Sequence, residues 1–422
     1  MMQEFLSEES SMKSTITKLH HQLDSITKYL APLLPIANCH MVEFITQNHW
    51  ERLLPTHLRE TLNDTELNHL LDRFWSYARQ ECKDDSPLST WVHTARSHCV
   101  TVNNEYCLSS EQLHDRIKAL GGDIRPEIRI KEFMTSKKSY EVQTMSRLVA
   151  SLHTAIGSTC CVEAGGGRGH LPVALCLAFS VPSLTVDCDA AAVASAPERI
   201  KIIQKQWHAI AKRIKNGIEE RVSEGIDKNL HRFATAFITK DTDLTAVVKY
   251  KFPEFAGDDV KLLLTGYNLG RNARMLAAQS IDRVVSNRQL PSKSLLYRAL
   301  LQAIIKKHLP NYSVSEGKLK RITPKCQDFQ QYFKMADEIL KLELFDSLPD
   351  SFFTDIQITL DGQWKKLVLF YLIRLCLAQV IESLILLDRL LFLFESDFDK
   401  VYLVKLFDPV LSPRCHSIVA VR

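Results

Sequence analysis

The sequence predicts an α/β fold, with a parallel sheet in the middle of the chain and helical regions on either side of it. Two observations lead to this prediction. Short apolar runs alternate with helical segments between residues 160 and 266, which is typical of parallel sheets covered by helices on both faces. Before residue 120 and after residue 266, by contrast, apolar residues recur at helical spacing.

The composition is that of a soluble globular protein large enough for two or three domains, with 422 residues, 45% hydrophobic and 24% charged. A net charge of +4 is too small to indicate a nucleic-acid partner by itself. The eleven cysteines show no metal-ligand spacing, so we expect no metal site and reduced thiols in the cytoplasm or nucleus. The N-terminal stretch MMQEFLSEESS has three acids and no apolar run, and we do not expect a signal peptide there.

Residues 1–125 form a predicted helical N-terminal region. Apolar residues from Ile16 to Leu30 recur every three or four positions and predict one buried stripe on a helix. A later helix is expected to stop at Gly121, because glycine readily adopts the left-handed conformation that ends helices. A further helix is expected to begin near Ser136.

Residues 126–290 contain the predicted sheet domain, which we expect to bind a cofactor. Its four expected strands are TCCVEA, SLTVDCD, FATAFIT and VKLLLTG. The helix GHLPVALCLAFS follows the first strand, and a long basic helix follows the second. Residues 399–422 contain two β-rich runs around an Asp-Pro…Ser-Pro turn, for which we predict an antiparallel hairpin that completes the sheet.

Residues 291–398 form a predicted helical insertion. It contains DIQITL, a weak strand candidate, and the strongly apolar stretch Trp364–Glu395. The longest uncharged runs of this stretch, Leu367–Ile373 and Leu375–Ile381, are far shorter than the roughly 18–20 residues that a membrane span needs. We therefore expect a buried helix or helical pair here rather than a membrane segment.

The stretch CVEAGGGRGHLPVAL places a run of glycines between an expected strand and an expected helix. Such a loop exposes backbone N–H groups and lets a ligand approach closely. It lacks the Gly-Lys-Ser/Thr ending of a phosphate-binding P-loop, and His170 stands where a dinucleotide site has a third small residue. The remaining candidate ligand is S-adenosylmethionine, because an acid two residues before the glycines suits a ligand with a cationic amino-acid end. The candidate cofactor-binding residues of this loop are Glu163, Gly165, Gly166, Gly167 and Gly169.

Asp187 supplies a second acid for the same cofactor. It ends the second expected strand, 22 residues after Gly165, where a carboxylate can accept hydrogen bonds from both ribose hydroxyls. Asp189 is the alternative residue for this role. For the glycines, the alternative is a plain strand-to-helix turn that binds no ligand.

Five segments together resemble the methyltransferase-like protein 25 family, which includes a protein named ribosomal RNA adenine dimethylase domain-containing protein 1. They are FMTSKKSYEV, VEAGGGRGHL, LPSKSLLYRALLQAI, ESLILLDRLLFLFE and LFDPVLSPRCHSIVAVR. The resemblance covers most of the chain from about residue 40. It implies the Rossmann-like sheet of an S-adenosylmethionine methyltransferase, with helical additions before and after the sheet. It does not indicate the substrate.

By this resemblance, Lys137, Lys138 and Glu141 match the family segment ahead of the glycine loop. Lys138 is then a candidate partner for the carboxylate of the cofactor, although a solvated helix start is equally compatible with the two lysines. Tyr140 stands where relatives often have histidine. The larger departure follows Gly266, where the family's His, Cys and Asp after strand four have no counterparts and no convincing fifth strand follows.

Two hypotheses for the function remain open. The first is an S-adenosylmethionine-dependent methyltransferase that acts on protein, RNA or a small molecule, and the second is a non-catalytic cofactor-binding or interaction protein with a shortened substrate pocket. TGYNLGR lacks the Asn/Asp-Pro-Pro-Tyr/Phe element of adenine N6 methyltransferases. The lysines of the helix from Arg199 to Arg221 favour a solvated face over an RNA surface. No catalytic residue is predicted, and neither is the oligomeric state.

Overall fold

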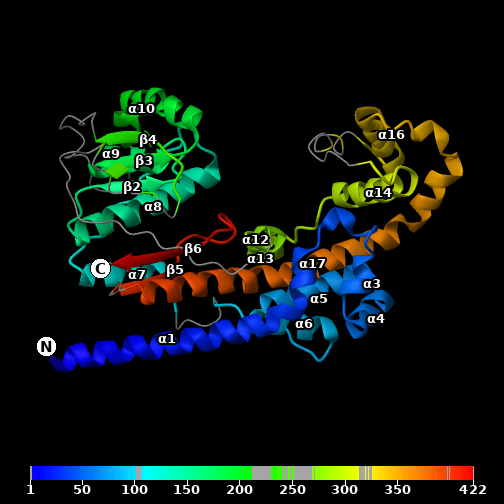
Figure 1. Cartoon of the computed structure of the whole chain (residues 1–422), viewed down its shortest axis with the longest axis horizontal. Helices are drawn as coiled ribbons and strands as arrows, with labels where there is room; N and C mark the ends of the chain where they lie inside the picture. Colours follow the sequence, from blue (N-terminus) through cyan, green and yellow to red (C-terminus); the bar gives the residue numbers. More distant parts are fainter. Residues whose placement is uncertain are drawn as a thin grey trace. The chain divides into compact units, whose positions relative to one another are not determined.

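The computed structural model describes residues 2–100, 106–211, 230–239, 271–312, 326–396 and 400–421, with a few single residues between these ranges. The fold is mixed α/β, as the sequence predicted (Figure 1). The chain divides into two compact units: unit 1 is Met1–Asn104 with Asn268–Asp399 and Arg422, and unit 2 is Glu105–Tyr267 with Lys400–Val421. The helical segments expected before the sheet and in residues 291–398 thus largely share unit 1.

Every secondary-structure element in the described part of unit 1 is a helix. The predicted stripe on its first helix is buried at Leu19, Ile26 and Leu30. The α-helices and 3-10 helices (η) of this unit are α1 Met2–Leu30, η1 Ala31–Leu33, α2 Leu34–Asn38, η2 Met41–Glu43, α3 His49–Leu53, α4 Thr56–Asp64, α5 Leu67–Arg79, α6 Pro87–Ser97, α12 Arg271–Ala277, α13 Ile281–Ser286, α14 Lys293–His308, α16 Phe329–Leu340, η4 Phe345–Ser347 and α17 Asp350–Phe394.

Helix α17 is a single helix of 45 residues, and α1 packs along it (Figure 1). It includes the segment Asp355–Leu360, so the weak strand candidate there is wrong. Among the described helices, α17 is long and apolar enough to cross a membrane, but 78% of its most apolar window is buried inside the protein. Arg374, in the middle of it, is buried and donates hydrogen bonds to the carbonyl oxygens of Ile36 and Ala37. A buried core helix, as expected, accounts for these contacts.

Three parallel strands form the sheet of unit 2 that carries the glycine loop, in the order β2-β3-β4. Their bounds are β2 Cys161–Ala164, β3 Ser183–Asp187 and β4 His231–Thr235. The helices of this layer are α8 Ser136–Ala155, α9 His170–Phe179 and α10 Ala190–Ala211. The predicted strand–helix order is confirmed up to β4. The fourth expected strand, VKLLLTG, and the end of the basic helix lie outside the described residues.

An apolar core joins the three helices of this layer to the segment before α8. Val142 of α8, Val173 of α9 and Trp207 of α10 are buried in one cluster, together with Ile128 and Ile130. On the sheet, Leu184 and Val186 of β3 are fully buried. Leu184 and Val186 share one face of the strand, and Ser183 and Thr185 on the other face are also fully buried. A strand buried on both faces is typical of the centre of a parallel sheet, which is where β3 lies.

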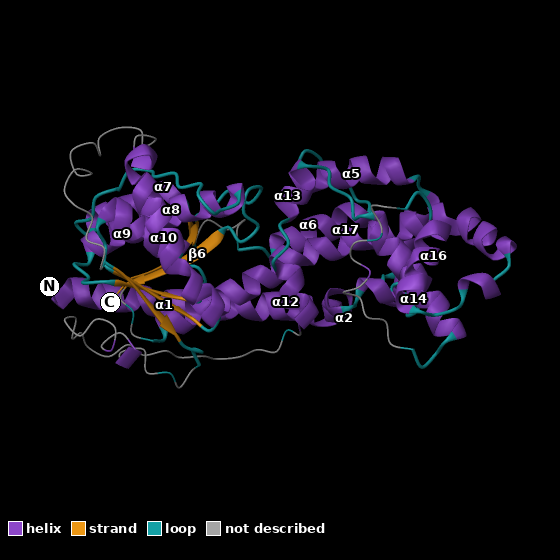
Figure 2. Ribbon diagram, turned by 90° about the horizontal axis from the view of Figure 1, so that it is seen from above, coloured by secondary structure: helices purple, strands orange, loops and turns teal. Residues whose placement is uncertain are grey.

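The C-terminal hairpin belongs to a second small sheet, whose strands are β1 Cys107–Leu108, β5 Lys400–Lys405 and β6 His416–Val421 (Figure 2). Strands β5 and β6 pair antiparallel, as predicted, and β1 pairs parallel to β5. Within the described residues the hairpin makes no ladder with β2–β4. That it completes their sheet stays a prediction, because the fourth expected strand lies outside the described residues. The apolar face of the hairpin packs on α8 and on α7 Ser110–Ala119.

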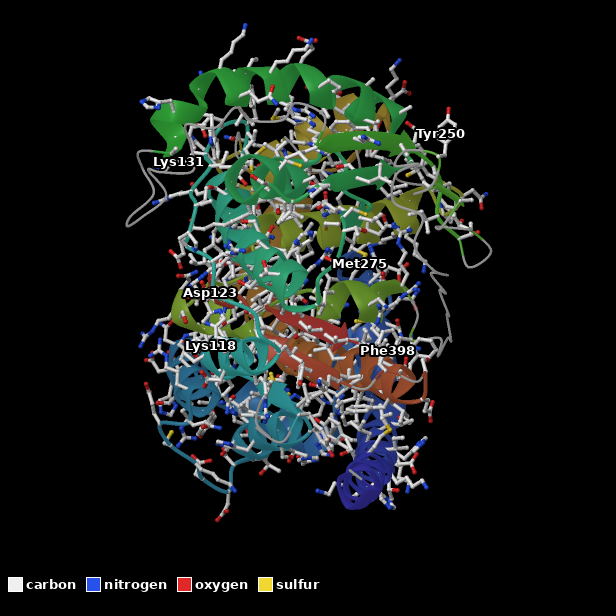
Figure 3. All side chains as sticks on the ribbon, turned by 90° about the vertical axis from the view of Figure 1, so that its left-hand side faces the viewer. Lys118, Asp123, Lys131, Tyr250, Met275 and Phe398 are labelled. Atoms are coloured by element: carbon white, nitrogen blue, oxygen red, sulfur yellow. The ribbon has the colours of Figure 1, made fainter. Side chains whose placement is uncertain are left out.

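The connection from α7 to α8 combines a helix stop with buried apolar anchors. Gly121 has a φ of +83° and follows the end of α7, as the sequence predicted. Ile128 and Ile130 are buried, whereas Lys118, Asp123 and Lys131 lie on the surface (Figure 3). The buried isoleucines fix the path of the chain into the first turn of α8, next to the glycine loop.

Candidate cofactor-binding site

The glycine loop lies between the carboxyl end of β2 and the start of α9, residues 165–169. Gly165, Gly167 and Gly169 have φ angles of +71°, +53° and +68°, which L side chains rarely adopt. Gly166 is required for a different reason, because a Cβ atom there would collide with the carboxyl group of Glu163 and lie 2.8 Å from the methyl group of Thr185. The loop is therefore built for glycine at all four predicted positions.

Glu163 lies directly beneath this loop. Its Oε2 atom is buried and has no hydrogen-bond partner among the described residues. Burial raises the pKa of this carboxyl group from 4.5 to about 7; the positive charge of Lys138 opposes the shift and the negative charge of Asp187 adds to it. An unpartnered buried carboxyl oxygen is costly, and a cationic ligand would supply its missing partner.

Asp187 stands at the carboxyl end of β3 and binds the loop. It accepts hydrogen bonds from the backbone N–H of Gly167, at 2.6 Å, and from that of Asp189, at 2.8 Å. These two backbone donors hold the pKa of the Asp187 carboxyl group below its usual value. An ionised carboxylate has about four acceptor sites, so these two bonds alone do not exhaust its capacity for a ligand.

Asp189, the alternative candidate for the ribose contact, binds the start of helix α10 instead. Its Oδ1 accepts hydrogen bonds from the backbone N–H groups of Ala191 and Ala192, each at 3.0 Å. These contacts make it the cap of α10, because the first N–H groups of a helix lack partners within the helix. Of the two acids, Asp187 is the one in contact with the glycine loop.

Lys138 lies in the first turn of α8, which is capped by Thr135. Its positive charge lowers the pKa values of both Glu163 and His170, so it lies within electrostatic range of the loop from the α8 side. Burial is the larger cause for His170 and, with nearby cations, lowers its pKa to about 4. His170 is therefore neutral near pH 7. Lys137 instead pairs with Glu141, at 3.6 Å.

Two polar residues beneath the loop were not predicted from the sequence. Thr185 of β3 and His231 of β4 share a hydrogen bond of 2.9 Å between Oγ1 and Nε2. A Cβ atom on Gly169 would lie 2.9 Å from the His231 ring and 3.0 Å from the Thr185 hydroxyl oxygen. Burial lowers the pKa of His231 to about 3, so the ring is neutral. The sequence did offer one indication of Thr185, because a polar threonine stands among the apolar residues of the predicted strand SLTVD.

The assembled residues suit a ligand with an amino-acid end. A buried carboxyl group, a nearby lysine and a half-buried carboxylate surround a loop with four glycines. Such an arrangement would bind an ammonium, a carboxylate and a pair of hydroxyl groups, which are the groups that S-adenosylmethionine presents. The acceptor side of the site would follow Gly266, and that segment lies outside the described residues.

Comparison with known proteins shows that the chain is similar to methyltransferase-like proteins along nearly its whole length. It is 24% identical to probable methyltransferase-like protein 25 of Mus musculus over 585 aligned positions, which cover 96% of each chain. It is also 24% identical to the Homo sapiens protein of the same name over 594 positions, covering 96% of this chain and 97% of that one. The predicted resemblance to the methyltransferase-like protein 25 family is confirmed.

The aligned stretch is much longer than the chain itself. The 585 positions contain 96% of a chain of 422 residues, so this relative has substantial segments without counterparts here. No family model matches the chain, and no solved structure matches it.

Proposed function

We propose that this protein is an S-adenosylmethionine-dependent methyltransferase whose β2–β4 sheet and helices α8–α10 form a Rossmann-like cofactor domain. One observation carries the proposal, the buried and unpartnered Oε2 of Glu163 beneath a loop of four glycines. The names of the two relatives support the same class of protein. The methyl acceptor stays open among protein, RNA and small molecules.

Each residue has a definite role in this proposal. Glu163 would hold the ammonium of the cofactor and Lys138 its carboxylate, while Asp187 would accept hydrogen bonds from the ribose hydroxyls. The glycines let the ligand lie against the backbone. The bound cofactor would supply a methyl group on a sulfonium, which is already a good leaving group. The residues of the chain would therefore act mainly by positioning the cofactor and the methyl acceptor.

The binding part of the proposal is tested by calorimetry with S-adenosylmethionine. The wild type is expected to bind, and Glu163→Gln is expected to bind at least about tenfold more weakly, because it removes the charge that faces the ammonium. No binding by the wild type would overturn the proposal.

Two glycines offer a matched pair of variants for the same titration. Gly165 and Gly157 both have positive φ, and a Cβ atom on either would meet nothing within 4 Å. Alanine at either position therefore has a similar backbone cost, about 1–2 kcal/mol. Only Gly165→Ala lies in the loop, so it alone is expected to weaken cofactor binding; equal binding by both variants would contradict the site.

A second candidate function is a cofactor-binding protein that transfers no methyl group. The relatives' additional segments favour it, since a shortened chain can retain the cofactor residues and lack part of the acceptor side. Both candidates predict the same binding result. A transfer assay separates them.

A further inference from the structure

Glu141 connects the start of α8 to the turn between β5 and β6, here called the C-terminal turn, residues 406–415. The hydroxyl group of Ser412 donates a hydrogen bond of 2.7 Å to Oε1 of Glu141, and Ser412 is fully buried. One residue earlier on α8, the hydroxyl oxygen of Tyr140 accepts a 2.8 Å hydrogen bond from the backbone N–H of Asp408. Two successive residues of the helix are thus bound to one turn.

The C-terminal turn is itself a rigid support. Its base is closed by the backbone N–H groups of Leu406 and Phe407, which donate to the carbonyl oxygen of Cys415. These three residues are buried in a core that contains Leu113 of α7 and Leu148 of α8. An anchor on this turn therefore fixes the helix start to the packed part of unit 2.

The helix start needs such an anchor, because the first turn of a helix has unsatisfied N–H groups and opens easily. Lys138 lies in that turn, three residues before Glu141 and on the same helix face. The ion pair of Glu141 with the exposed Lys137 contributes little to holding it, since ion pairs open to solvent are weak. The hydrogen bond with Ser412 is the stronger restraint, because one partner is charged and the other is buried.

We propose that Glu141 is a positioning residue of the cofactor site, which fixes Lys138 opposite Glu163 by joining α8 to Ser412 of the C-terminal turn. The inference rests on the proposed function, because Lys138 is placed there as the partner of the cofactor's carboxylate. It adds a residue that does not touch the ligand. It also gives the C-terminal segment a part in cofactor binding.

The affinity of the full chain for S-adenosylmethionine, measured by calorimetry, tests this role. Glu141→Ala is expected to bind about tenfold more weakly, and Glu141→Gln, which retains an acceptor for Ser412, to stay within about twofold of the wild type. Ser110→Ala is the matched control, because Ser110 joins the same hairpin to α7 rather than to the start of α8. Unchanged affinity of Glu141→Ala would overturn the inference.

A double-mutant cycle separates positioning from a general loss of structure. If Glu141 acts through Lys138, then Glu141→Ala adds almost nothing to the loss of affinity in a Lys138→Met background. An equal loss in both backgrounds would overturn the inference.

Amide hydrogen exchange tests the anchor without any cofactor. Glu141→Ala is expected to speed the exchange of residues 139–142 and to leave α9 unchanged. Unchanged exchange at 139–142 would overturn the inference even if the cofactor binds. A wild type that binds no cofactor would instead remove the proposed function, with the exchange result still reporting on the anchor.

Discussion

At the scale of single residues, the burial of Glu163 is expected to make the stability of the protein depend on pH. Its pKa is raised from 4.5 to about 7 in the folded protein, mainly by burial. Below pH 4.5 the group is protonated in both states and has no effect on folding. As the pH rises toward 7, the unfolded chain ionises first, so this group lowers the free energy of unfolding. The full effect above pH 7 is about 3 kcal/mol.

The prediction is that Glu163→Gln stabilises the protein at pH 8 and leaves its stability at pH 4.5 nearly unchanged. Glutamine cannot ionise, so the cost of burying a charge is removed only where wild-type Glu163 carries one. Chemical denaturation at both pH values measures the difference. Glu127→Gln is the control, since Glu127 is an exposed partner of Arg147 and is expected to show no such pH dependence. Parallel pH profiles for the wild type and Glu163→Gln would contradict the burial argument.

A second prediction concerns the two aspartates near the end of β3. Asp187→Asn is expected to weaken S-adenosylmethionine binding about tenfold or more, because an amide has only one acceptor oxygen for the N–H groups of Gly167 and Asp189. Asp189→Asn is expected to retain affinity, since asparagine caps helices as well as aspartate does. Calorimetry on both variants decides between them, and the reverse ranking would assign the ribose contact to Asp189.

At the scale of elements, helix α17 depends on a cation within its apolar stretch. Arg374 is buried, and its guanidinium donates to the last carbonyls of α2 at 3.1 and 2.9 Å. These oxygens lie where α2 has no further backbone donors of its own. The arginine therefore joins the two helices of unit 1 and satisfies buried acceptors in the same contact.

We predict that Arg374→Met lowers the free energy of unfolding by about 3 kcal/mol, because it removes the guanidinium donor from the buried carbonyl of Ala37 and leaves the buried carbonyl of Ile36 with only the weak thiol donor of Cys39. Lys365→Met is the matched control on the same helix. Lys365 also donates to a backbone carbonyl, that of Asn63, but the contact is exposed and its loss is expected to cost under about 1 kcal/mol. Urea denaturation measures both, and equal losses would show that burial does not govern the contact.

The sequence predicted those elements whose signals are local. Strand β2, the glycine loop and α9 follow from a short apolar run, a glycine run and a helical pattern that adjoin one another. The hairpin of β5 and β6 was also predicted from a local pattern, but its pairing with β1 was not. Strand β1 has only two residues and lies almost three hundred positions before β5, so no local pattern indicates the pairing.

The same distinction explains which site residues were found. Glu163, the glycines and Asp187 belong to a spacing that can be read along the chain, and the structure places the two acids beside the loop. Thr185 and His231 meet only because β3 and β4 are paired neighbours. Ser412 meets Glu141 across 271 positions. Contacts of this kind depend on tertiary packing, which spacing does not encode.

At the scale of the whole molecule, cofactor binding and methyl transfer place different demands on the chain. The proposed cofactor residues belong to β2, β3, the glycine loop and the first turn of α8. The acceptor side of the site would depend on the segment after Gly266, most of which lies outside the described residues. The relatives align over more positions than this chain contains, so they have segments without counterparts here. Binding and transfer should therefore be measured separately.

The last prediction is that the full chain transfers labelled methyl groups from S-adenosylmethionine to a component of cell extract. The sulfonium is already activated, so a positioned acceptor in a closed site is sufficient for measurable transfer. Glu163→Gln is the control, and it should lose label in proportion to its loss of cofactor affinity. Label that is independent of Glu163 would point to a contaminating enzyme. Cofactor binding without any transfer, over extracts from several cell types, would contradict the methyltransferase proposal and favour the cofactor-binding protein, because the residues that hold the ligand are separate from those that would present an acceptor.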